Sequence, residues 1–232
     1  MCSQFESVNS INKIAKATHA FVDSDVVNLT WQPHIYPHSQ APVVTSCHSH
    51  NHIRMMSYSL VPHWSKEAKP KFSTYNARLD RVGQDNKLEV IYNSPTWKLP
   101  FAKQRCLVPL SGFYESCKIG SHAGHIVKFA PGNSDEILLA AGIWDKWVNN
   151  ESGEMIFSFA IITDNPCQFI QDVGHDRQPV FLDPEKAQFW MDYEKTPVKD
   201  AYDFLKQNQV PVDYTVENVR ALKGAKQNDL FS

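Results

Sequence analysis

Strand-like segments are the most numerous feature of this chain, and they seldom alternate with helical ones. The most apolar stretch, Arg105–Ser116, reads as two strands because Pro109 and Gly112 interrupt it. Strands in this order favour an α+β fold built on a mainly antiparallel, barrel-like sheet with flanking helices. We predict further strands at Pro42–Cys47, Ile53–Leu60, Ile126–Phe129, Ile137–Trp147, Met155–Thr163 and Val212–Val216.

Helices are fewer and have recognisable starts. Ser10 is placed to cap a short amphipathic helix that carries Ile11 and Ile14 on one face. Three later helices are predicted, each with a proline near its first turn: Pro166–Gln171, Pro184–Trp190 and Pro197–Gln207. We find no linker or repeat, so the 232 residues are expected to form one domain with a loose polar tail from about Lys223.

The charge of the chain is nearly balanced, but its distribution is not. A formal net charge of −2, from 23 basic and 25 acidic residues, argues against a general nucleic-acid coat protein. The segment from Arg54 to Arg105 nevertheless holds 10 basic and 4 acidic residues. This excess fits either an ordinary mixed surface or a positive cleft for an anionic partner.

The N-terminus lacks the features of a signal peptide, and no apolar run is long enough to span a bilayer. Five scattered cysteines fit free thiols in a reducing compartment better than a disulfide framework. We therefore expect a cytoplasmic protein.

Cys2 follows the initiator methionine, and removal of Met1 would leave a thiol and a free α-amine on one residue. The α-amine of a peptide has a pKa of about 7.7–8.0, so part of it is an uncharged nucleophile near neutrality. Together the two groups can capture an aldehyde, because the amine forms an imine that the thiol closes to a thiazolidine. The competing interpretation is an ordinary second residue of the chain.

Three histidines, His48, His50 and His52, alternate along one segment, and on a strand they would share a face as metal ligands can. The alternative is a polar turn, which we favour because no second ligand pair lies at a recognised spacing.

Three further stretches combine side chains suited to catalysis and anion binding. Asn76 and Arg78 stand two residues apart, Glu115 follows the apolar strands, and His175 and Arg177 follow a glycine. Each has a plain structural reading as a turn amide, a strand-end carboxylate or a loop histidine.

Motifs in a fixed order along most of the chain resemble the SRAP (SOS-response-associated peptidase) family of abasic-site cross-linking proteins. They are Met1–Phe5, Tyr36–Gln40, Ser59–Trp64, Asn76–Arg78, Arg105–Pro109, Gly112–Glu115, Gly142–Trp144, Phe159–Thr163 and His175–Pro179. The sequence departs from the family pattern at Ser3 and Gln4, where Gly-Arg is usual, at Ser116, where Trp is usual, and at Gln178, where Met is usual.

The resemblance implies a SRAP-like fold and covalent capture of abasic sites in single-stranded or junction DNA by a monomer that uses no cofactor or metal. It implies catalytic roles for Cys2, Asn76, Glu115 and His175, and DNA contacts for Arg78, Arg177, Trp64 and Pro37. Removal of Met1 would be by self-cleavage or another route.

Three alternatives remain open. The family's older name suggests a thiol peptidase that uses Cys2 with His175. The histidine tract would support a metal-dependent hydrolase. Gln4 and Ser116 are compatible with a DNA-binding relative of reduced activity.

Overall fold

The computed structural model describes residues 3–22, 24, 26–48, 50–83 and 86–222. Its main feature is a closed, five-stranded mixed barrel formed by β4 (Gln40–Cys47), β5 (His50–Tyr58), β12 (Met155–Asp164), β11 (Leu138–Val148) and β9 (Arg105–Cys117). These strands pair in the order β9-β4-β5-β12-β11, and β11 returns to β9. The β12–β5 pair is parallel and the other four are antiparallel, which confirms the predicted α+β fold with a mainly antiparallel barrel-like sheet.

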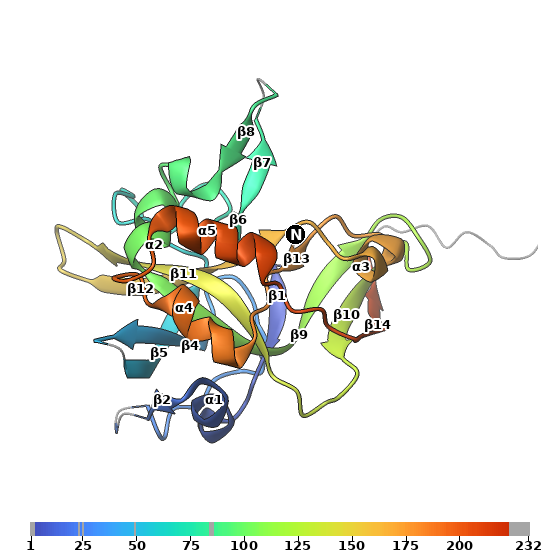
Figure 1. Cartoon of the computed structure of the whole chain (residues 1–232), viewed down its shortest axis with the longest axis horizontal. Helices are drawn as coiled ribbons and strands as arrows, with labels where there is room; N and C mark the ends of the chain where they lie inside the picture. Colours follow the sequence, from blue (N-terminus) through green and yellow to red (C-terminus); the bar gives the residue numbers. More distant parts are fainter. Residues whose placement is uncertain (1–2, 23, 25, 49, 84–85, 223–232) are drawn as a thin grey trace, which may run out of the picture.

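The long strand β9 continues beyond the barrel, and there it pairs with strands that are not part of the barrel. Its C-terminal half lies between β1 (Gln4–Ser7) and β10 (His125–Pro131). β1 also pairs with β3 (His34–Ile35), and β10 with β14 (Tyr214–Ala221). Figure 1 shows β10 and β14 together at one end of the molecule, away from the barrel strands β4 and β5.

The prediction that Pro109 and Gly112 break this strand was wrong. β9 changes neighbours near Pro109: pairing with β4 ends at Leu107 and pairing with β1 begins at Leu110, so the missing N–H interrupts neither ladder. Gly112 does not form a turn; it allows the backbone of β10 to come close to β9. A Cβ there would lie 2.8 Å from the Phe129 carbonyl oxygen on β10.

The predicted helices are present, with small shifts at their ends. α1 (Ile11–Thr18) is capped by Ser10, whose hydroxyl accepts a hydrogen bond from the Lys13 N–H. α3 (Gln168–Val173), α4 (Pro184–Met191) and α5 (Val198–Gln207) follow in the C-terminal third. The short elements α2 (Lys98–Lys103), η1 (Ile91–Asn93), β2 (Ala20–Phe21), β6 (Asn76–Arg78), β7 (Asp80–Val82), β8 (Leu88–Val90) and β13 (Gln178–Pro179) were not predicted.

Arg105 joins the barrel to the helices that cover it. It is 1% exposed and donates hydrogen bonds to the carbonyls of Phe101, Trp190 and Thr196, at 2.8, 3.3 and 3.2 Å. Its guanidinium also lies over the Trp190 ring, 5.1 Å from the centroid. Burial lowers the pKa of Arg105 to about 10, and Asp192 opposes that shift, so the side chain remains charged near neutrality.

We expect Arg105→Met to lower the free energy of unfolding by about 3 kcal/mol, because it leaves buried carbonyls without a donor. Urea unfolding followed by tryptophan fluorescence measures this, with Trp190 as a nearby reporter. The control is Lys103→Met, an exposed position on α2 that should change stability by no more than about 0.5 kcal/mol. Equal stability of the two variants would contradict the role given to Arg105.

Candidate active site

A buried carboxylate and a buried imidazole meet at the centre of the candidate site. Glu115 lies on β9 on the same face as Phe113 and Cys117, which are fully buried, so its side chain points inward. His175 follows α3, and its Nε2 lies 2.9 Å from Oε2 of Glu115. The two residues are 2% and 7% exposed.

Gly174 brings His175 to this place. It ends α3 in the left-handed conformation, with φ of 105°, and a Cβ there would lie 2.1 Å from the Ile119 carbonyl oxygen. A glycine therefore lets the end of α3 pack against the loop that follows β9, which carries Glu115.

The second ring nitrogen of His175 faces the backbone of Arg177. Nδ1 lies 3.0 Å from the Arg177 carbonyl oxygen and 3.3 Å from the Arg177 backbone nitrogen. The carbonyl can only accept a hydrogen bond and the N–H can only donate one. Nδ1 therefore has a partner whether it carries a proton or not, and Nε2 faces the carboxylate in both cases. This environment suits a group that gains and loses protons during a reaction.

Arg78 and Arg177 reach the site from two segments that flank the C-terminal end of β12. β6 pairs in parallel with β12, with Arg78 opposite Thr163, and β13 pairs with the same strand on its other side, with Pro179 opposite Thr163. Arg177 immediately precedes β13. Since side chains alternate along a strand, Asn76 shares the face of Arg78, while Ala77 between them is fully buried.

Asn76, Arg78 and Arg177 line one cleft of about 740 Å³. Burial, and after it the positive charge of Arg78, lowers the pKa of Arg177. Its Nε is buried and has no hydrogen-bond partner among the residues described. Two adjacent guanidiniums repel each other, and a bound anion would relieve that repulsion and supply the missing acceptor.

An aromatic pair stands beside the cleft. Trp64 and Phe72 are each 48% exposed, and their rings stack with centroids 6.3 Å apart and an interplanar angle of 17°. Phe72 also lines the cleft. Phe72 was not predicted, although an aromatic residue in a Lys- and Pro-rich loop after Trp64 is a signal that could have indicated it.

The other predicted residues lie outside the cleft or outside the described part of the chain. Pro37 is half-buried in the loop between β3 and β4 and does not line the cleft. Cys2 and Met1 lie outside the described residues, as does the predicted loose tail from Lys223. Gln4, two residues after Cys2, pairs with Tyr114, the neighbour of Glu115 on β9.

The structure shows what is contacted by three of the residues at which the sequence departs from the family pattern. Gln4 Oε1 lies 3.2 Å from Nε2 of His34. Ser116 pairs with Ile126 on the β9–β10 ladder. Gln178 accepts a hydrogen bond of 2.8 Å from the Cys167 N–H at the start of α3, which leads to His175.

The histidine tract does not form the face that a metal site requires. His48 lies in the turn between β4 and β5 with φ of 49°, outside the strand that holds His50 and His52. Within the described part of the chain there is no group of three or more His, Cys, Asp or Glu side chains that could hold a metal ion.

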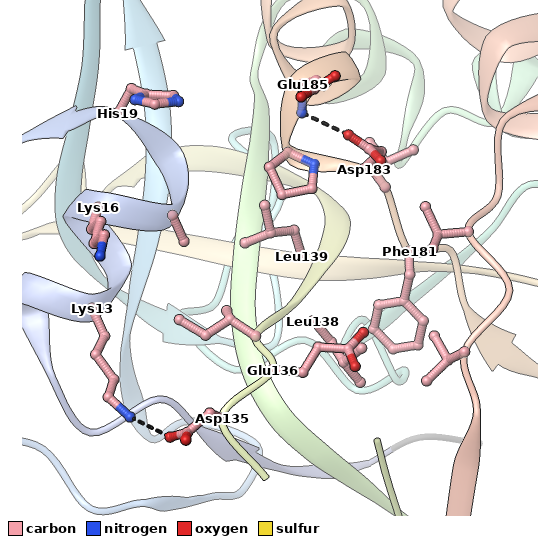
Figure 2. Close-up of a pocket in the computed structure, with 16 residues that line it drawn as sticks. Lys13, Lys16, His19, Asp135, Glu136, Leu138, Leu139, Phe181, Asp183 and Glu185 are labelled. Atoms are coloured by element: carbon pink, nitrogen blue, oxygen red, sulfur yellow. Dashed lines mark hydrogen bonds and ion pairs between the residues drawn. The ribbon is translucent and has the colours of Figure 1, made fainter. Parts of the chain in front are cut away.

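A second cavity, larger than the cleft, is separate from this chemistry. It measures about 930 Å³ and shares no lining residue with the cleft. Figure 2 shows Lys13 and Lys16 of α1 on one side of this cavity, where Lys13 contacts Asp135, and Asp183 and Glu185 at the start of α4 on the other side. The apolar side chains of Leu139 and Phe181 also line it. Among the described helices, none is long and apolar enough to cross a bilayer.

Comparison with known proteins agrees with the fold and with the order of the motifs. The model of the family described as SOS response associated peptidase (SRAP) matches residues 1–221. Abasic site processing protein YoaM of Bacillus subtilis is 25% identical over 215 residues, covering 92% of this chain and 87% of that protein. Abasic site processing protein HMCES of Pongo abelii is 29% identical over 220 residues, covering 79% of this chain and 59% of that protein. A crystal structure of a Bacteroides thetaiotaomicron protein has a TM-score of 0.73 at 21% identity, covers 94% of this chain and 92% of its own, and supports the fold alone.

Proposed function

The chain belongs to the SOS response associated peptidase (SRAP) family, and from that premise we propose that it captures abasic sites in DNA covalently. The DNA is single-stranded or lies at a junction, and the reactive group is the N-terminal Cys2 after Met1 has been removed. The related proteins of Bacillus subtilis and Pongo abelii are named for the processing of abasic sites, which supports this substrate.

The proposed reaction forms two bonds to one carbon. The α-amine of Cys2 attacks the aldehyde of the ring-opened sugar, and loss of one water gives an imine. The Cys2 sulfur then adds to the imine carbon, and a proton moves to the nitrogen, which closes a thiazolidine. One water leaves in total, and no oxidant or reductant is needed.

Glu115 and His175 supply the proton transfers of this sequence. Glu115 takes and returns protons during imine formation, and in self-removal of Met1 if that occurs. His175 assists opening of the sugar ring by protonating its leaving oxygen, a step that also serves reversal of the link. The backbone around Nδ1 supports this role, because the ring keeps a partner there with or without the proton.

DNA binding is assigned to the cleft and its aromatic rim. Arg78 and Arg177 contact the phosphates that flank the lesion with planar, bidentate groups. Asn76 holds the sugar or the N-terminal residue through its amide. Trp64 stacks on an unpaired base, next to Phe72. Pro37 contributes a contact from outside the cleft.

One observation carries the proposal: the buried Glu115–His175 contact adjoins, through Arg177, a cleft that holds two neighbouring guanidiniums. A proton-transfer pair next to a binding site for anions fits chemistry on the sugar of a phosphate-flanked lesion. A thiol peptidase would instead use a Cys2–His175 pair, and turnover of peptide substrates tests that alternative.

A denaturing gel tests the proposed function. Protein mixed with a single-stranded oligonucleotide that contains an abasic site should give a heat-stable, slower-migrating adduct. An oligonucleotide with a tetrahydrofuran lesion, which has no aldehyde, should give none. Absence of any adduct together with turnover of peptide substrates would replace the proposal by the peptidase alternative.

A further inference from the structure

A small β-hairpin stands apart from the main sheet. β7 and β8 pair only with each other among the described strands, in a register that places Val82 opposite Leu88 and Arg81 opposite Glu89. Figure 1 shows the hairpin extending outward from the body of the molecule beyond β6. Such a projection buries little of its own surface, so its stability depends on how its base is held.

The base of this hairpin is held by α5. Tyr202 donates a hydrogen bond of 3.0 Å to Oδ2 of Asp80, and Nζ of Lys206 lies 3.2 Å from the same oxygen. Lys206 also contacts Asp164 at the end of β12, at 2.9 Å. These contacts join the first residue of β7 to the strand that β6 and β13 flank. The hairpin is therefore fixed relative to the cleft.

The hairpin forms one wall of that cleft. Arg81, Lys87 and Leu88 line it together with Arg78 and Arg177. Among the described lining residues the charged side chains are four basic ones and Glu89, which pairs with Arg81 at 2.6 Å. The hairpin thus adds two basic side chains, one of them paired with Glu89, to the wall of the cleft that holds Arg78 and Arg177.

Two apolar side chains stand on the same hairpin in contact with water. Val82 is 68% exposed and Leu88 is 63% exposed, and they lie directly opposite each other across the two strands. Because side chains alternate along a strand, this pair stands on the face of the hairpin opposite Arg81 and Glu89, and Leu88 also lines the cleft. In DNA-binding elements, apolar side chains pack against unstacked bases while basic ones contact phosphates.

We propose that the β7–β8 hairpin is a DNA-contacting arm. Arg81 and Lys87 contact phosphates of the strand that leaves the cleft, and Val82 and Leu88 pack against an unstacked base of that strand. DNA is favoured over a protein partner because the arm lines the same cleft as Arg78 and Arg177. This inference rests on the proposed function, which places the lesion strand in that cleft.

Fluorescence anisotropy tests the arm. The probe is a labelled single-stranded oligonucleotide with a central tetrahydrofuran lesion, which binds without cross-linking. The double variant Val82→Ser and Leu88→Ser should weaken binding roughly tenfold at fixed salt, with an unchanged dependence on salt concentration. Lys87→Gln should instead make the negative slope of log K against log salt less steep by about 0.7, the value for one phosphate contact on a single strand.

The matched control is Val219→Ser, which removes an exposed apolar side chain from β14 and should leave the affinity unchanged. Affinities within twofold of the wild type for both arm variants would overturn the arm, and the apolar pair would then serve a protein contact. That outcome is distinct from failure of the proposed function, in which wild-type protein forms no adduct with aldehyde-containing DNA.

Discussion

Cys2→Ala is expected to abolish the heat-stable adduct with abasic single-stranded DNA. The variant retains a small second residue and therefore a free α-amine once Met1 is removed, but it has no thiol to close the ring. The imine that forms is hydrolysed under denaturing conditions. The measurement is the fraction of DNA shifted on a denaturing gel, and we expect no detectable shift.

Reduction with borohydride distinguishes imine formation by the α-amine from ring closure by the thiol. It converts an imine to a stable amine, so the Cys2→Ala variant should regain an adduct when borohydride is present during the reaction. An N-terminal extension that leaves Cys2 inside the chain should show no adduct with or without borohydride, because its nitrogen is then an amide. A heat-stable adduct from Cys2→Ala without reductant would disprove the thiazolidine mechanism.

The four described cysteines provide matched controls. Cys47 and Cys167 are exposed, and Cys106 and Cys117 are buried. Burial raises the pKa of the thiols of Cys106 and Cys117, which keeps them protonated and weakly nucleophilic near neutrality. Cys167→Ala removes an exposed thiol without an adjacent amine, and it should leave the adduct unchanged.

The fold was predictable where the signal is local. The cap of Ser10 and the proline starts of α4 and α5 depend on neighbouring residues, and these helices begin within one residue of the expected positions. The unbroken course of β9 was not predictable from Pro109 and Gly112, because their effect depends on which strands lie alongside. The β7–β8 hairpin was missed because each strand has only three residues, too few for a periodic pattern.

The candidate site was predictable only in part, for a similar reason. Asn76 and Arg78 share a face by strand alternation alone, once the segment is known to be a strand. The contact between Glu115 and His175 depends on two elements far apart in the sequence, and Gly174 is its only local signal. The basic excess between Arg54 and Arg105 corresponds in part to one wall of the cleft, since Arg78, Arg81 and Lys87 all line it.

Glu115→Gln is expected to slow adduct formation by roughly 10²- to 10⁴-fold, the range typical of a lost acid–base group. The amide keeps the volume and the hydrogen-bonding capacity of the buried side chain but cannot take up a proton. Affinity for tetrahydrofuran-containing DNA should stay within about twofold of the wild type, because no phosphate contact is removed. Single-turnover gel kinetics give the rate, and Glu217→Gln, an exposed position on β14, is the control.

The same measurement on His175→Gln and on the double variant decides whether the pair acts as one unit. The two side chains meet through a single contact between Nε2 and Oε2. Because the two residues are assigned different protons of the reaction, we expect their separate effects to multiply in the double variant, with the buried contact positioning the two side chains. A double variant no slower than the slower single variant would show instead that the contact transmits one shared proton.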